Sequence, residues 1–236
     1  MAYQWDWQVY LNDTGAGQTY LQWMMSAWGW TLAVSALAWV LALVVGSLVG
    51  VLRTVPHKGL QWLANAWVEL FRNIPLLVQV FLWYHVVPAL FPAMKSLSSF
   101  VLVVCALGFF TSSRVAEQVR AGIESLPRGQ MMAALATGLT VAQAYRYVIL
   151  PMAFRVILPP LTNEAMNIVK NSSVAFAVSV SELIMFAMQA QEETARGIEI
   201  YLGVTGLYII SALAINRVMA LVESRVRLPG YVGAGR

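Results

Sequence analysis

Charged and amide side chains stand inside segments of this sequence that are otherwise strongly apolar. Charged groups are costly in an apolar environment, so they usually face a polar cavity or an oppositely charged partner. Arginine can bind a carboxylate in bidentate fashion, and amide and hydroxyl groups also donate hydrogen bonds to anions. We therefore predict that one set of residues lines a pathway for a polar solute, with pairing inside the protein as the open alternative. This set is Arg72, Asn73, Glu164, Asn167, Lys170, Asn171 and Ser172, in which 164, 167 and 171 share one helical stripe.

A second set of charges recurs at three-residue spacing, which places its members on one face of a helix. Arg114, Glu117 and Arg120 form such a ladder close to the end of an apolar segment, and Glu69 stands three residues before Arg72. Internal ion pairing is the simpler explanation for charges close to a membrane surface. We therefore predict a structural charge ladder of Glu69, Arg114, Glu117 and Arg120.

The sequence offers no group of residues suited to catalysis or to metal binding. His57 and His85 are isolated, and the single Cys105 lies in an apolar run where an inert thiol is expected. No Gly-x-x-x-x-Gly-Lys-Ser/Thr pattern for phosphate binding occurs. We therefore expect no catalytic residue, no metal and no cofactor bound by this chain, which cannot hydrolyse ATP itself.

The composition indicates a helical membrane protein. Of the 236 residues, 59% are hydrophobic and 11% are charged, whereas soluble domains carry about 25% charged residues. No Asp, Glu, Lys or Arg occurs between Asp13 and Arg53. The net charge of +4 is expected from basic residues in cytoplasmic loops rather than from nucleic-acid binding. An all-α protein embedded in the lipid bilayer is therefore predicted.

Five membrane spans are predicted, each at least as long as the roughly 20 apolar residues that a bilayer requires. They cover about 28–52, 63–87, 98–121, 152–187 and 200–222, with a kink at Pro75 in the second and a bend at Pro159 and Pro160 in the fourth. The aromatic segment 1–27 is expected at the outer interface or in the periplasm, 28–223 in the membrane domain, and 224–236 in a cytoplasmic tail. Basic residues gather on one side of this topology, which places the N-terminus outside and the C-terminus inside.

The loop 122–151 is amphipathic and separates the third and fourth spans. Pro127 suits the first turn of a helix, and Met131, Ala134, Leu135 and Leu139 form an apolar stripe. Gly138 can end that helix in a left-handed conformation, and Thr140 with Gln143 is a capping-box pattern that starts a second helix. We expect this second helix to stop at Pro151. Such an elbow could lie in a groove on a partner, or it could pack on its own bundle or on lipid headgroups.

Several motifs of the sequence resemble those of the polar amino acid ABC importer permeases. Gly129-Gln130-x-x-Ala133-Ala134-x-x-x-Gly138, followed by Leu150-Pro151 and Arg155, resembles the family's coupling loop. Within the family, the nearest resemblance is to permeases of glutamate and aspartate importers. The other motifs that carry the resemblance are Leu52–Pro56, Glu69–Gln79, Arg114–Arg120, Leu158–Glu164, Val169–Ser173 and Val226–Gly230.

The resemblance implies a type I ABC importer permease fold of five transmembrane helices with a cytoplasmic coupling helix. It implies alternating access in the bacterial inner membrane. The implied partners are a cytoplasmic ATPase dimer that binds ATP, a related second permease subunit, and an extracytoplasmic amino acid-binding protein. The residues implied to contact the ATPase are Gly129, Gln130, Met132, Ala133, Ala134, Gly138, Leu139 and Pro151.

One position departs from the family pattern. The family usually has Glu before the two alanines of the loop, where this chain has Met132. Met132 can contribute packing but no charge, so the second permease is expected to supply the usual charged contact. The implied substrate is glutamate or aspartate. A permease for another polar or basic amino acid and a subunit of an ion-coupled secondary transporter are the alternatives.

Overall fold

The computed structural model describes residues 3–226. These residues are helical apart from turns, loops and one isolated bridge between Asp13 and Thr19. The sequence motif at Val226–Gly230 and most of the predicted tail 224–236 lie outside the described residues. Two compact units make up the chain: residues 1–40, 75–108 and 167–213 form unit 1, and residues 41–74, 109–166 and 214–236 form unit 2.

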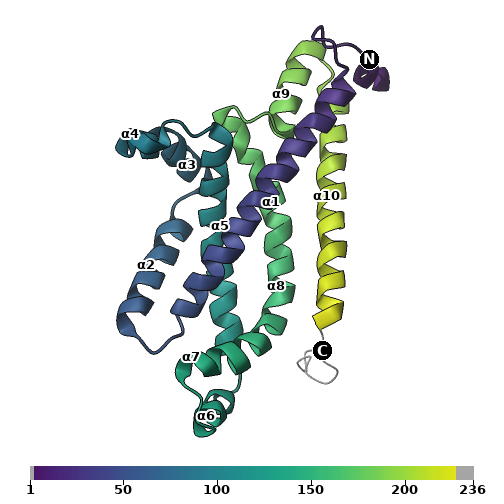
Figure 1. Cartoon of the computed structure of the whole chain (residues 1–236). Helices are drawn as coiled ribbons and strands as arrows, with labels where there is room; N and C mark the ends of the chain where they lie inside the picture. The colour runs from purple at the N-terminus through teal and green to yellow at the C-terminus, as the bar shows by residue number, and fades with distance from the viewer. Residues whose placement is uncertain (1–2, 227–236) are drawn as a thin grey trace. The chain divides into compact units, whose positions relative to one another are not determined.

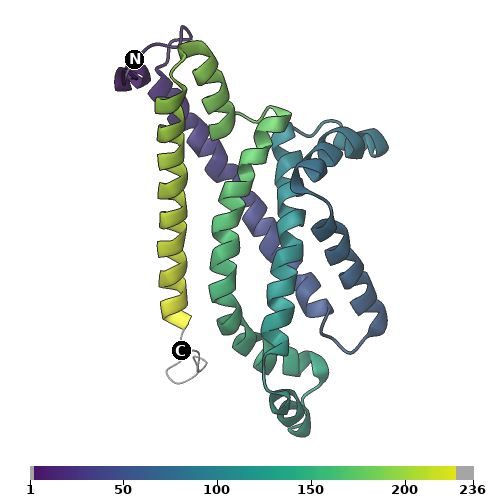
Figure 2. The same cartoon turned by 180° about the vertical axis from the view of Figure 1, so that it is seen from behind.

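Long apolar helices dominate the described residues. Four continuous helical segments could cross a membrane: α1 (Tyr20–Leu52), α5 (Ser99–Glu124), the run Val141–Val178, and α10 (Gly197–Val226). A fifth candidate is the broken pair of α2 (Lys58–Asn73) and the segment Leu76–Leu90. These helices can be followed by colour in Figure 1 and from behind in Figure 2. The all-α prediction is confirmed, with four to five candidate spans.

Shorter helices complete the chain. Two 3₁₀ turns are Trp7–Leu11 and Pro92–Met94. Leu76–Leu90 consists of α3 (Leu76–Phe81), a π-helical turn (Leu82–Val86) and α4 (Val87–Leu90). The run Val141–Val178 consists of α7 (Val141–Ala144), a π-helical turn (Tyr145–Ile149), α8 (Leu150–Asn171) and a 3₁₀ segment (Ser172–Val178). The remaining helices are α6 (Arg128–Ala136) and α9 (Leu183–Thr194).

Two predicted span boundaries are wrong. The second segment does not merely kink, because Ile74 and Pro75 are both extended (ψ 128° and 138°) and separate α2 from α3. Proline disfavours the helical conformation of the residue before it, which explains a complete break. The fourth span does not reach Ala187, since the helical run ends at Ser179 (φ 60°) and Glu182 begins the separate helix α9. In contrast, α8 continues through Pro159 and Pro160.

The core of unit 1 joins the start of α1 to α9 and to the start of α10. Its buried apolar residues include Val9, Met24, Phe186, Ile200 and Val204. Helix α1 begins at Tyr20 rather than near Trp28, and the residues before it pack against α10. The Tyr10 hydroxyl donates to the Glu199 carbonyl at 2.7 Å.

The core of unit 2 depends on very close helix packing. A Cβ atom built on Gly46 or Gly50 would lie 2.6 Å from the Cβ of Val115 or Val119, respectively. The two glycines, four residues apart on α1, thus let its backbone approach that of α5, as small residues do in membrane helix pairs. Buried Val49, Val68 and Ala116 pack together beside them, so α1, α2 and α5 form one packed group.

Candidate functional site

Glu117 of α5 is the centre of a polar network in unit 2. Its Oε1 lies 3.1 Å from Nη1 of Arg53 and 3.1 Å from Nη1 of Arg72. The Arg53 Nε also donates to Oδ1 of Asn65 at 2.8 Å. The side chain of Arg53 is almost fully buried, with 7% exposed, whereas that of Arg72 is 54% exposed. One carboxylate therefore joins the end of α1, helix α2 and helix α5.

A second ion pair joins α5 to α8. The Nε of Arg114 lies 2.9 Å from Oε2 of Glu164, whose side chain is only 8% exposed. The Arg114 guanidinium gives this buried carboxylate an oppositely charged partner. Glu69 and Arg120 have partners one helical turn away. The Asn73 amide donates to Glu69 at 2.8 Å, and Arg120 lies 3.6 Å from Glu124.

The sequence assigned these charges to two separate sets, and the structure pairs members of one set with members of the other. Arg72 and Glu164, predicted for the pathway, contact Glu117 and Arg114, predicted for the structural ladder. The ladder residues Arg114, Glu117 and Arg120 have partners on other helices or one turn away rather than each other. Spacing along one helix predicted which residues share a face, but the partners come from helices distant in sequence.

Four further predicted pathway residues, Asn167, Lys170, Asn171 and Ser172, follow Glu164 along the same helical run and belong to unit 1. Lys170 is exposed, while Asn167 and Asn171 are partly buried. Ser172 is fully buried and donates to the carbonyl of Val169 at 2.7 Å. Lys170 and Asn171 therefore present a cation and an amide, on neighbouring positions, to the surroundings of the helix.

The loop 122–151, which we call the elbow, has the helix–turn–helix form expected from its sequence (Figure 1). Gly138 has φ +87°, the left-handed conformation that ends α6. The capping box is present: the Gln143 amide N–H donates to the Thr140 hydroxyl at 3.3 Å, and the Thr140 N–H donates to the Gln143 side chain at 2.8 Å. Pro127 precedes α6 as its capping residue. The local signals therefore predicted this geometry correctly.

The predicted end of the elbow at Pro151 is wrong. Helix α7 passes through the π-helical turn Tyr145–Ile149 directly into α8, in which Pro151 is the second residue. In a regular helix the proline ring would collide with the carbonyl four residues earlier, at Tyr147. The Leu150 N–H instead bonds the Tyr145 carbonyl, five residues back, and this wider turn gives the ring room. The elbow is thus rigidly continuous with α8.

Apolar side chains of the elbow remain exposed. Met132 is 64% exposed and Leu135 is 43% exposed, although the predicted stripe also contains Ala134, which is buried. Of the residues implied to contact an ATPase, Gly129, Ala133, Gly138 and Pro151 are exposed, and Gln130 and Leu139 are partly exposed. This part of the elbow therefore offers a surface that its own unit leaves uncovered.

The sequence analysis missed Glu182, a fully buried acid in unit 1. Its carboxylate accepts hydrogen bonds from the Ile184 and Met185 amides at 2.9–3.0 Å and from the Tyr208 hydroxyl at 3.1 Å. Burial raises the pKa of Glu182 to about 7, against the lowering effect of these donors. A signal was available, because this acid stood inside a segment that was predicted to be a continuous span.

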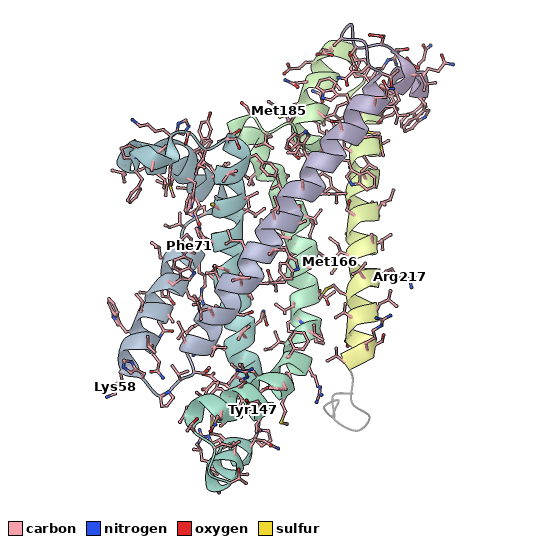
Figure 3. All side chains as sticks on the ribbon, viewed as in Figure 1. Lys58, Phe71, Tyr147, Met166, Met185 and Arg217 are labelled. Carbon is pink, nitrogen blue, oxygen red and sulfur yellow. The ribbon has the colours of Figure 1, made fainter. Side chains whose placement is uncertain are left out.

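Figure 3 draws the side chains on the ribbon and labels, among others, Phe71 on α2 and Tyr147 in the elbow. On α2, Phe71 packs against Trp67 with ring centroids 4.5 Å apart, and Trp67 donates to the Ser112 hydroxyl at 3.1 Å. At the elbow, Tyr147 is 62% exposed beneath the guanidinium of Arg146. Among the described residues, no group of three or more potential ligands could hold a metal ion.

Comparison with known proteins identifies the family. The profile of the family "Binding-protein-dependent transport system inner membrane component" matches residues 42–228. The chain is 45% identical to the glutamate/aspartate import permease protein GltJ of Escherichia coli K12, over 99% of both chains. It is 37% identical to the probable glutamine ABC transporter permease protein GlnM of Bacillus subtilis, over 83% of this chain and 89% of that protein.

Solved structures agree with this assignment. The crystal structure of an amino acid ABC transporter with histidines shares 32% identity and superposes with a TM-score of 0.76, covering 87% of this chain and 95% of that chain. The MetNI methionine ABC transporter in an inward-facing conformation superposes with a TM-score of 0.74 at 21% identity, over 88% and 98% of the two chains, which supports the fold alone. The alternative of an ion-coupled secondary transporter is not supported. The chain belongs to the family of binding-protein-dependent transport system inner membrane components, the integral membrane permeases of ABC importers.

Proposed function

We propose that this permease carries acidic amino acids, glutamate and aspartate, across the bacterial inner membrane. The observation that carries the proposal is the 45% identity over 99% of both chains to a glutamate/aspartate import permease. The cation of Lys170 beside the amide of Asn171 suits a substrate with two carboxylates. The proposed pathway residues are Arg72, Asn73, Glu164, Asn167, Lys170, Asn171 and Ser172.

The proposed coupling device is the elbow, which would dock into a cleft of a separate ATPase dimer. Its uncovered surface around Met132 and Leu135 supports this role, because exposed apolar side chains favour a protein partner. The ATPase would bind and hydrolyse ATP, so this chain itself needs no cofactor. Closure of the ATPase dimer would move α5 and α8, which flank the elbow.

A second, related permease and an extracytoplasmic binding protein complete the proposed assembly. A second glutamate/aspartate import permease of Escherichia coli, GltK, is 29% identical to this chain, over 83% of this chain and 89% of GltK. In this proposal residues 28–223 form the membrane domain. The segment 1–27 and the N-terminus lie outside, and the elbow and the tail 224–236 lie in the cytoplasm.

Transport by a purified complex tests the proposal. The permease pair and its ATPase are reconstituted in liposomes with the binding protein inside or outside, and radiolabelled glutamate, aspartate, glutamine, histidine and arginine are offered with and without ATP. We expect ATP-dependent uptake of glutamate and aspartate. Uptake without ATP, or a preference for glutamine, would contradict the proposal, and the second outcome would favour the function named for the Bacillus subtilis relative.

The contribution of Asn171 is tested in the same assay. The resemblance to polar amino acid permeases implies Asp at the position where this chain has Asn171. An added carboxylate would repel an anionic substrate. Asn171→Asp is expected to lower the rate of glutamate uptake about tenfold more than the rate of glutamine uptake, which corresponds to about 1.4 kcal/mol. Asn171→Ser serves as the control without charge. Equal uptake by Asn171→Asp and the wild type would exclude Asn171 from substrate choice.

A further inference from the structure

The turn between α1 and α2 is linked to the elbow by a hydrogen bond, in addition to the covalent links that join the elbow to α5 and α8. The elbow is joined covalently to α5 at one end and to α8 at the other. It is also tied to the α1–α2 turn, since the Tyr145 hydroxyl donates to the Thr54 carbonyl at 2.8 Å and lies 3.2 Å from the Thr54 hydroxyl. All of these residues belong to unit 2.

The position of Tyr145 makes this connection stiff. Tyr145 is the first residue of the π-helical turn between α7 and α8, and its side chain is 8% exposed. Thr54 is held in turn, because its hydroxyl donates to the Val51 carbonyl at 2.8 Å. Each end of the hydrogen bond is thus held against its own helical element, Tyr145 by burial and Thr54 by its bond to Val51.

The α1–α2 turn also contacts two further helices, α2 and α5. Arg53, the residue next to Thr54, contacts Glu117 on α5 and Asn65 on α2. Through Arg53 and Thr54, a displacement of the elbow reaches α1, α2 and α5 as well as α8. Helix α2 ends at the break before Pro75, beside the proposed pathway residues Arg72 and Asn73.

We propose that Tyr145 is a positioning residue for energy coupling, whose hydrogen bond to Thr54 transmits elbow movement to α1 and α2. The inference rests on the proposed ATPase docking at the elbow. It adds a specific route by which that docking moves helices to which the elbow has no covalent link. Without the hydroxyl, ATPase closure would still move α5 and α8, but α1 and α2 would follow less completely.

The test measures amino acid uptake per ATP hydrolysed by the reconstituted complex. Tyr145→Phe keeps the buried ring and removes only the hydroxyl. Tyr147→Phe removes an exposed hydroxyl two residues away, which makes no hydrogen bond to the residues that the structure describes. We expect about fivefold less uptake per ATP for Tyr145→Phe, as loss of one hydrogen bond predicts. The ATP hydrolysis rate and complex size should stay unchanged, and the melting temperature should fall by no more than the loss of one hydrogen bond predicts, about 2–4 °C. Tyr147→Phe should behave as the wild type, and Thr54→Val, which keeps the carbonyl acceptor, should lose less than Tyr145→Phe.

The outcomes separate this inference from the proposed function. An unchanged uptake-to-ATP ratio in Tyr145→Phe, or an equal loss in Tyr147→Phe, overturns the role of Tyr145 while leaving the importer proposal intact. A dissociated complex in Tyr145→Phe, or a fall in melting temperature well beyond that of one hydrogen bond, shows that the hydroxyl serves assembly or folding instead, and it also overturns the inference. Wild-type complex that takes up no amino acid in response to ATP overturns both.

Discussion

Glu182 is a fully buried acid that holds the start of a helix. Its oxygens accept the amide N–H groups of Ile184 and Met185, which have no acceptor within α9. The Thr31 hydroxyl accepts the amide of Leu183 at 3.1 Å. Glu182 lies between the candidate spans, and burial raises its pKa to about 7. The break between Val178 and α9 is therefore stabilised by a group that titrates near neutral pH.

The stability of the protein should depend on this group. A raised pKa means that the folded state binds the proton more tightly than the unfolded state does, so stability falls as pH rises from about 4.5 to about 7. The loss is up to about 3 kcal/mol above pH 7. We expect the melting temperature of the wild type in detergent to fall over this range relative to that of Glu182→Gln. Parallel curves for the two proteins from pH 4.5 to 8 would show that Glu182 keeps an ordinary pKa.

The ion pair of Arg114 and Glu164 should be sensitive to the loss of one partner. Arg114→Met leaves the carboxylate of Glu164 buried without its guanidinium, and we expect destabilisation by about 3 kcal/mol. Arg114→Met combined with Glu164→Gln should recover most of that loss, because no buried charge remains. Thermal unfolding of the three proteins measures both effects. If the double variant is no more stable than Arg114→Met, the loss of stability in Arg114→Met comes from altered packing and not from the unpaired charge of Glu164.

Residue-level features could be predicted from sequence only where their cause is local. Gly138 and the capping box of Thr140 and Gln143 depend on neighbours within a few residues, and both are present. The partners of Glu117 and Glu164 come from positions about 50 residues away in the chain. Nothing in the spacing of one segment determines which segment lies against it, so these pairs were not predictable.

The pairing of α1 with α5 in unit 2 depends on two glycines of α1. Gly46 and Gly50 face Val115 and Val119, and the carbonyl oxygen of Ser112 lies 2.7 Å from a Cβ built on Gly46. A backbone carbonyl cannot rotate away as a side chain can. Any side chain at Gly46 must therefore push the two helices apart.

Gly46→Ala should destabilise the protein by about 2 kcal/mol, since overpacking typically costs 1–3 kcal/mol. Gly29→Ala is the matched control on the same helix, because a Cβ there meets nothing within 4 Å. Alanine favours the helix over glycine by about 1 kcal/mol, so the control should be neutral or stabilising. Melting temperatures of both variants make the comparison. Equal effects of the two substitutions would show that α1 and α5 are not closely packed at Gly46.

The end of α6 was predicted correctly, because the αL conformation of Gly138 is a local backbone effect of glycine. At Ile74–Pro75 proline gives a complete break, where only a kink was predicted. The predicted helix end at Pro151 was wrong, because a π-helical turn accommodates the proline ring. No single residue type indicates such a turn in the sequence. The helix end at Ser179 was also not predicted, because serine in the sequence does not indicate a positive φ as glycine does.

At the scale of the whole molecule, the proposed assembly depends on the uncovered surface of the elbow. Leu135→Asp places a charge on that surface while leaving the buried core of unit 2 untouched, since Leu135 is 43% exposed. We expect the affinity for the ATPase to fall at least tenfold, or about 1.4 kcal/mol, with an unchanged melting temperature of the permease alone. Copurification and titration with the ATPase measure this affinity. Leu90→Asp, exposed at 68% on α4, is the control away from the elbow.

At Met132 an added negative charge could strengthen binding to the ATPase instead of weakening it. It is 64% exposed at the position where the family usually has Glu. If the ATPase cleft carries a matching cation, Met132→Glu should tighten binding by about 0.5–1 kcal/mol and salt should weaken the gain. Met132→Gln, which adds polarity without charge, is the comparison. Weaker binding by Met132→Glu than by Met132→Gln would indicate a cleft adapted to an apolar contact.

The π-helical turn Tyr145–Ile149 also carries one extra residue without changing the phase of the helix around it. Because a π-helical turn holds about one residue more than an α-helical turn, deletion of one residue here would leave the helices on either side in about their present rotational register. The deletion would instead restore α-helical spacing before Pro151, and the proline ring would then collide with the carbonyl four residues earlier. A one-codon deletion would therefore strain the junction between the elbow and α8, while every side chain on the surface of Met132 and Leu135 stayed the same.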